Sequence, residues 1–179
     1  MPLKIDGAGN LTSTSGNITT DINFTSPGDV LQIRFAQFRT GANHISLTTT
    51  SEVTLGDTCS ITPLYANSVI QVRFWSSLSY GAANALSTAL YRKIGSGSYQ
   101  AVVGIADSGW ASTTNPYYGW THNANTWDHL DTKYFDRPNT TQEVTYQLRY
   151  RNWSSSSTLY LVHCCQHYYS WTLSEIGAP

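Results

Sequence analysis

A succession of short β-rich runs, separated by Gly, Asn, Ser and Pro, constrains the fold of this chain most strongly. Nine such runs occur: Val30–Phe35, Ile45–Thr49, Val69–Trp75, Ala89–Ile94, Ala101–Ile105, Lys133–Phe135, Val144–Tyr150, Thr158–Val162 and Trp171–Ile176. About nine short strands are typical of a β-sandwich or jelly roll. The sequence therefore predicts an all-β domain of this kind.

The segment Thr145–Tyr150 shows how such a strand divides its side chains between two faces. Apolar and polar residues alternate: Tyr146, Leu148 and Tyr150 on one face, and Thr145, Gln147 and Arg149 on the other. Since successive side chains of a strand point to opposite faces, one face is expected to be buried and the other to meet water.

Two segments depart from the strand pattern. The alanine-rich stretch Gly81–Leu90 is compatible either with one short helix or with a loop that enters a strand. The first 28 residues are mainly Gly, Ser, Thr, Asn and Asp with isolated apolar residues, so they cannot pack alone. We expect residues 1–28 to form an extended segment intertwined with partner chains, and residues 29–179 to form the β-sandwich.

The composition limits the classes of partner. Of 179 residues only 12% are charged, the net charge is −1, and a broad basic surface for nucleic acid is absent. The low charge combined with 13% aromatic residues indicates that other subunits cover part of the surface. No run is long and apolar enough for a membrane-spanning helix, and residues 1–10 lack a secretory signal. We expect synthesis in the host cytoplasm and no membrane insertion.

The run from Ile105 to Phe135 is the most distinctive part of the sequence, because it carries three of the six tryptophans among Gly, Asn, Thr, Ser, His and Asp. Glycine, proline and asparagine there predict loops, and loops on a β-scaffold commonly carry recognition. Aromatic rings stack on sugars while amides, carboxylates and histidines bond to hydroxyls. The predicted ligand-binding residues are Trp110, Tyr117, Tyr118, Trp120, His122, Asn123, Asn125, Trp127 and Asp128. The alternative is that these aromatic residues pack a subunit interface or a cluster beneath a long loop.

Catalysis has weak support. Glycosidases need two carboxylates about 5 to 10 Å apart, which Asp107, Asp128, Asp131 and Asp136 would have to supply. No nucleophile elbow, phosphate loop or zinc-protease motif occurs. The sequence therefore predicts a protein that is not an enzyme and has no cofactor. Calcium binding by His122, Asp128, His129 and Asp131 is not predicted either, since no Asp-x-Asp-x-Asp-Gly loop is present.

Several short segments together resemble the C-terminal domains of bacteriophage tail fibres over residues 28 to 179. The segments are Val30–Ile33, Thr58–Pro63, Ser68–Val72, Leu90–Arg92, Tyr134–Thr141, Thr145–Leu148 and the closing Thr172–Ile176. The resemblance implies a virion protein that forms a homotrimer, associates with other tail proteins and contacts a bacterial host through its distal surface. The aromatic insertion Asp107–Asp131 has no counterpart in that pattern.

The alternating residues His163, Cys165 and His167 are candidate metal ligands, because an extended strand places them on one face. Tail fibres contain octahedral histidine sites on the trimer axis, so His163 and His167 are the axial candidates that the resemblance suggests. The chain has no second ligand pair at zinc-finger spacing, and Cys164 and Cys165 are more typical of small buried residues. We therefore predict no bound metal. With Cys59 the cysteine count is odd, which also argues against a disulfide scaffold.

The sequence thus predicts a receptor-binding tail fibre domain, located in the virion, that trimerises and binds a host cell-surface glycan. Two alternatives remain open: a structural virion fibre or decoration protein without receptor binding, and a polysaccharide hydrolase.

Overall fold

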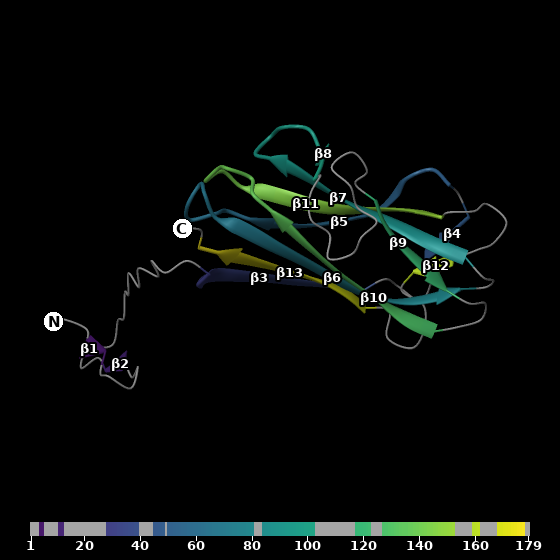
Figure 1. Cartoon of the computed structure of the whole chain (residues 1–179), viewed down its shortest axis with the longest axis horizontal. Coiled ribbons are helices and arrows are strands. Elements are labelled where there is room, and N and C mark those ends of the chain that lie inside the picture. The colour runs from purple at the N-terminus through teal and green to yellow at the C-terminus, as the bar shows by residue number, and fades with distance from the viewer. Residues whose placement is uncertain are drawn as a thin grey trace.

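Every element in the described part of the chain is a β-strand (Figure 1). The computed structural model describes residues 4–5, 11–12, 28–39, 45–48, 50–80, 84–102, 117–122, 127–152, 159–161 and 168–177. The strands are β1 (Lys4–Ile5), β2 (Leu11–Thr12), β3 (Val30–Arg39), β4 (Ile45–Leu47), β5 (Val53–Ile61), β6 (Val69–Tyr80), β7 (Asn84–Ile94), β8 (Gln100–Ala101), β9 (Tyr117–His122), β10 (Trp127–Asp136), β11 (Val144–Asn152), β12 (Leu159–Leu161) and β13 (Tyr168–Ile176). Within these ranges no helix could span a membrane.

Two antiparallel sheets form the body of the domain. The β6 sheet has the order β3-β13-β6-β10, with β12 and β4 continuing it beside the far end of β6. The β11 sheet has the order β5-β11-β7, and both β8 and β9 pair with the remaining edge of β7. In Figure 1 the two sheets lie as layers, with β3, β13 and β6 below and β11, β7 and β8 above. Strands β1 and β2 pair only with each other among the described residues.

The order in which the chain visits the sheets defines a jelly roll. Its eight main strands are β3, β5, β6, β7, β9, β10, β11 and β13, and they form the sheets β3-β13-β6-β10 and β5-β11-β7-β9. Two four-stranded antiparallel sheets linked by Greek-key crossings are the jelly-roll arrangement. The prediction of an all-β sandwich or jelly roll is therefore confirmed.

The core lies between the sheets because each strand turns its apolar residues to the same side. In β11, Tyr146, Leu148 and Tyr150 are buried, whereas Gln147 and Arg149 between them are partly exposed. The alternation predicted for this segment is therefore confirmed from Tyr146 to Tyr150, but Thr145, which was expected to meet water, is buried.

Aromatic rings join the two layers across the core. Phe74 of β6 meets the ring of Tyr150 from the other sheet edge to face, at 6.1 Å between centroids. It also meets Trp171 of its own sheet at 5.1 Å. Such pairs contribute about 0.5–1.5 kcal/mol beyond the burial of their area, so Phe74 is a main contact between the sheets.

A polar clasp closes one edge of the sandwich. Asp136 of β10 is only 5% exposed; it pairs with Arg92 of β7 and accepts a hydrogen bond from the Tyr146 hydroxyl at 2.9 Å. A hydrogen bond of 3.0 Å between the hydroxyls of Thr88 and Tyr134 also joins β7 to β10. Because a buried carboxylate needs compensating partners, these contacts hold β10 in register with the opposite sheet.

The sequence was compatible with either a helix or a loop at Gly81–Leu90. In the structure, strand β7 begins at Asn84. Both faces of its middle are buried, and Ser87 and Leu86 are 0% exposed. The alanines therefore fit a covered strand between two neighbours, and the helical alternative is wrong.

Candidate functional site

Six of the nine predicted ligand-binding residues lie in strands, so the expectation that they occupy irregular loops is wrong for them. Tyr117, Tyr118, Trp120 and His122 belong to β9, and Trp127 and Asp128 begin β10. Tyrosine, tryptophan and threonine favour extended backbone, and pairing with β7 and β6 outweighs the single Gly119. The predicted residues Trp110, Asn123 and Asn125, and the metal candidates His163 and His167, lie outside the described residues.

The register of β9 divides its residues between the faces of the β11 sheet. Trp120 is opposite Leu86 and Tyr118 is opposite Thr88. Leu86 is fully buried, and Thr88 bonds across the core. The side chains of β9 are not among those the structure describes, and both ligand contact and packing stay predictions for Tyr117, Tyr118 and Trp120.

Two of the residues weighed for calcium or catalysis are engaged in other contacts. The Asp131 carboxylate accepts hydrogen bonds from Arg73 at 2.8 and 2.6 Å, and this pairing holds the pKa of Asp131 below its usual value. His129 stacks on Trp75 with ring centroids 5.3 Å apart. Within the described residues, no group of three His, Cys, Asp or Glu side chains is placed to hold a metal ion.

Two of the four carboxylates that hydrolysis would need are engaged in other contacts, and the side chain of Asp128 is not among those described. Asp136 is buried in the clasp with Arg92 and Tyr146, and Asp131 is paired with Arg73. Neither is placed as a free acid or base at a surface. Asp107 lies outside the described residues.

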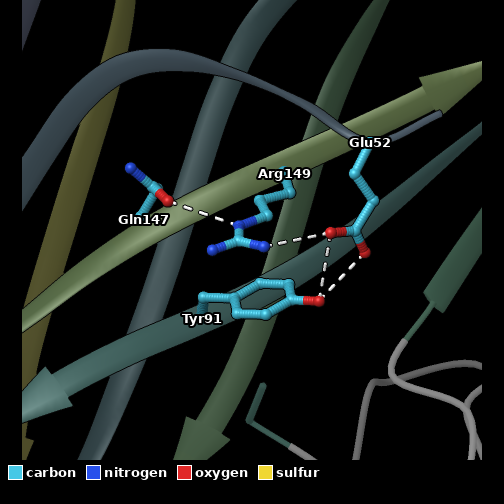
Figure 2. Close-up of polar contacts among 4 residues, drawn as sticks. All are labelled: Glu52, Tyr91, Gln147 and Arg149. Atoms are coloured by element: carbon cyan, nitrogen blue, oxygen red, sulfur yellow. Dashed lines mark hydrogen bonds and ion pairs between the residues drawn. The ribbon is translucent and has the colours of Figure 1, made fainter. Parts of the chain in front are cut away.

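A preorganised polar cluster, which we call the Arg149 cluster, lies on the outer face of the β11 sheet (Figure 2). It consists of Arg149, Glu52, Tyr91 and Gln147. The Arg149 guanidinium lies over the Tyr91 ring, 3.7 Å from its centroid, and donates to Glu52 Oε2 at 3.1 Å. Tyr91 donates its hydroxyl proton to the same carboxylate at 2.9 Å.

The Arg149 cluster is only partly solvated. The side chains of Arg149 and Glu52 are 29% and 24% exposed. Partial burial, followed by the hydrogen bond to Glu52, raises the pKa of Tyr91, so its hydroxyl stays a donor. The guanidinium is thus fixed from below by an aromatic ring and from one side by a carboxylate.

The outer face of the β6 sheet is different in character. Phe35 is 64% exposed, Ile33 61% and Phe135 37%. The pairings Ile33–Ser174, Ser174–Gln71 and Gln71–Phe135 place apolar residues of the two edge strands in one row across the sheet. Among the described residues, β3 pairs as a strand only with β13, so its other edge has no strand partner there.

Sequence reasoning placed Gln147 and Arg149 on the wet face of their strand, and it did so correctly. It did not single them out as a site. Glu52 precedes Arg149 by 97 residues, and only the pairing of β11 with β5 brings these two residues together. No local motif in the sequence signals that contact.

No protein-family model and no curated protein matches the sequence. Among solved structures, the chain is similar to VP2 of infectious bursal disease virus in its subviral particle, with 13% identity over 91% of this chain and a TM-score of 0.53. It is also similar to a structure of the T13 particle of that virus, with 13% identity and a TM-score of 0.48; the match covers 92% of this chain and 40% of that one. A third similar structure is TmCBM61 in complex with β-1,4-galactotriose, with 9% identity and a TM-score of 0.34; the match covers 80% of this chain and 90% of that one. The chain spans 37% of the VP2 chain, and at this identity the VP2 likeness shows the fold alone.

Proposed function

We propose that this chain is a structural protein of a virion, a jelly-roll subunit that associates with copies of itself and contributes to attachment to a host. The observation that carries this proposal is the strand order β3-β13-β6-β10 and β5-β11-β7-β9. VP2 of a virus particle has a similar fold, and the sequence resembles tail fibre C-terminal domains. The specific form that we propose is the distal domain of a tail fibre, assembled as a homotrimer and without enzymatic activity.

Self-association is supported by the outer face of the β6 sheet. An edge strand with exposed Ile33 and Phe35 is a site for aggregation in a free monomer, because its backbone groups and apolar side chains both invite a partner. The exposed Arg34 between these two residues is a charge that such a partner has to accommodate. A second copy of this chain is the partner that would remove both the backbone groups of the β3 edge and these apolar side chains from water.

Attachment is assigned to the aromatic segment that the sequence singled out. Tyr117 pairs with Ala89 in β9, and Trp127 lies opposite Ser79 at the start of β10. We assign host glycan contact to these positions and to the neighbouring residues from Trp110 to Asp128. The test is binding of the protein to a printed glycan array, where Trp127→Ala loses the signal if this segment makes the contact.

The native mass of the full chain, measured by light scattering, tests assembly. A mass of three times 19.8 kDa is expected. The double change of Ile33 and Phe35 to serine, at positions already exposed, is expected to lower the mass without lowering the melting temperature. Tyr99→Ser, on the other sheet, is the matched control and leaves the mass unchanged. A monomer at all concentrations refutes assembly, and a dimer refutes the trimer.

A further inference from the structure

We infer that the Arg149 cluster is a binding subsite for the acidic group of a saccharide, a carboxylate or a sulfate. The inference deepens the attachment role proposed above by naming its ligand class, and it places that ligand on the outer face of the β11 sheet. Ala89 of β7 pairs with both Arg149 and Tyr117, so the cluster lies in the same sheet as strand β9 of the aromatic segment.

The guanidinium of Arg149 keeps one edge available. Its Nε donates to the Gln147 Oε1 at 3.4 Å and its Nη1 to Glu52, while no described residue accepts from Nη2. The amide nitrogen of Gln147 likewise has no partner among the described residues, because its oxygen is the atom that faces Arg149. Figure 2 shows both nitrogens on the side of the guanidinium away from Glu52. The Nη2 group carries two N–H donors, which can bond to an oxygen of a carboxylate or sulfate.

The guanidinium is held in place before a ligand arrives. The Tyr91 ring lies beneath it, and the Glu52 carboxylate holds both the guanidinium and the Tyr91 hydroxyl. A free arginine loses much rotamer freedom when it binds an anion, and here the fold has already restricted that freedom. A side chain fixed by three contacts, with one edge left open, is suited to recognition more than to stability alone.

The surroundings of Arg149 favour an anionic sugar over a bare anion. Lys93 and Tyr91 lie two residues apart on β7, so they are on the same face of the strand. Lys93 pairs with Thr145, and Tyr91 pairs with Gln147. The Lys93 ammonium lies 5.5 Å from the centre of the Tyr99 ring. Tyr99 is close enough to Arg149 for the positive charge to act on its pKa, which partial burial raises overall. Lys93 is a second cation on this face, and a sugar with an acidic substituent presents both an anion and hydroxyl groups to such donors.

Saturation-transfer NMR on the full chain tests the subsite with 3′-sialyllactose, galactose 6-sulfate and lactose as probes. Both acidic sugars are expected to bind, and lactose is expected to bind at least about tenfold more weakly, because it lacks the charged partner of Arg149. Binding of one acidic sugar alone identifies which anion the site takes. Equal binding of all three, or binding of none, overturns the inference.

Variants within the cluster should act in opposite directions. Arg149→Gln weakens acidic sugars about tenfold or more, whereas Glu52→Gln strengthens them, because it removes a competing negative charge and keeps an acceptor. Arg73→Gln is the matched control, since Arg73 pairs with Asp131 on the other sheet, and it leaves binding unchanged. Changes of the same sign for Arg149→Gln and Glu52→Gln, at unchanged melting temperatures, would contradict the inference. The native mass is measured separately, so failure of this subsite leaves the assembly proposal to its own test.

Discussion

Glu175 fixes the loop between β5 and β6, and its removal is expected to loosen that loop specifically. The carboxylate is 0% exposed and lies near the end of β13. It accepts from the backbone N–H of Leu64 at 2.8 Å, from that of Tyr65 at 3.2 Å, and from the Gln32 side chain at 2.6 Å. The loop therefore depends on one buried side chain that comes from more than a hundred residues later in the chain.

The cost of Glu175→Gln follows from those contacts. The glutamine oxygen still accepts from the loop, but its amide group then faces the Gln32 amide, and two donors meet where a charged acceptor stood. One lost charge-assisted hydrogen bond costs about 1.5–3 kcal/mol. In a domain of this size that lowers the melting temperature by roughly 3–12 °C. Glu175→Ala removes all three acceptor contacts and is expected to cost more.

Hydrogen exchange separates the local effect from the global one. In Glu175→Gln the amides of Leu64 and Tyr65 are expected to exchange faster by a larger factor than the core amide of Leu148. Glu143→Gln, an exposed carboxylate, serves as the control and leaves both unchanged. If Glu175→Gln alters the free energy of unfolding by less than about 0.5 kcal/mol, the loop does not depend on this carboxylate in the way its contacts indicate.

Two further predictions concern the ionic contacts between strands. Tyr146→Phe removes one of the contacts of the buried Asp136 carboxylate, and we expect a loss of about 1–3 kcal/mol in urea unfolding; a loss smaller than that of an exposed Tyr65→Phe would contradict this. For Asp131, pairing with Arg73 lowers the folded pKa below the ordinary 3.8, so its contribution is present above that pH and disappears as the pH falls through the folded pKa. Both side chains are more than a third exposed, so Asp131→Asn is expected to cost only about 0.2–1 kcal/mol at pH 7 and nothing at the acidic end of the titration. A cost that does not change with pH would show that the pairing is not electrostatic.

The sequence predicted those strands whose side chains alternate without interruption. Val69–Trp75 and Val144–Tyr150 fall within β6 and β11, because each has apolar residues at every second position facing one core. Strand β5 was missed. Its register shifts opposite Gln147–Arg149, near Gly56, which has a φ of +86°, and Val53–Ile61 is otherwise rich in threonine and serine. A bulge of this kind hides the alternation from any reading of the sequence alone.

The site was harder to predict than the fold for a related reason. Aromatic residues between glycines and asparagines were interpreted as a binding loop, yet β9 pairs with β7 along all six of its residues. Pairing of that kind depends on a strand about 30 residues earlier, which local composition does not reveal. The contact between Glu52 and Arg149 depends in the same way on the crossing of the jelly roll. The grouping of these residues depended on the topology, which residue types alone do not reveal.

The two outer faces of the sandwich divide the proposed roles between them. Ile33, Phe35 and Phe135 are exposed apolar residues on the outer face of the β6 sheet, which also carries the partly exposed Arg73–Asp131 pair, whereas the β11 sheet presents Arg149 and Glu52 as a fixed ionic pair. A second copy that covers the three apolar residues gains the burial of their apolar area, provided that the Arg73–Asp131 pair keeps its water or meets a polar partner. Covering the outer face of the β11 sheet would instead take the Nη2 group of Arg149 out of water without a counter-charge. Assembly through the β6 sheet, as proposed above, would leave the β11 sheet turned outward, toward the proposed acidic saccharide.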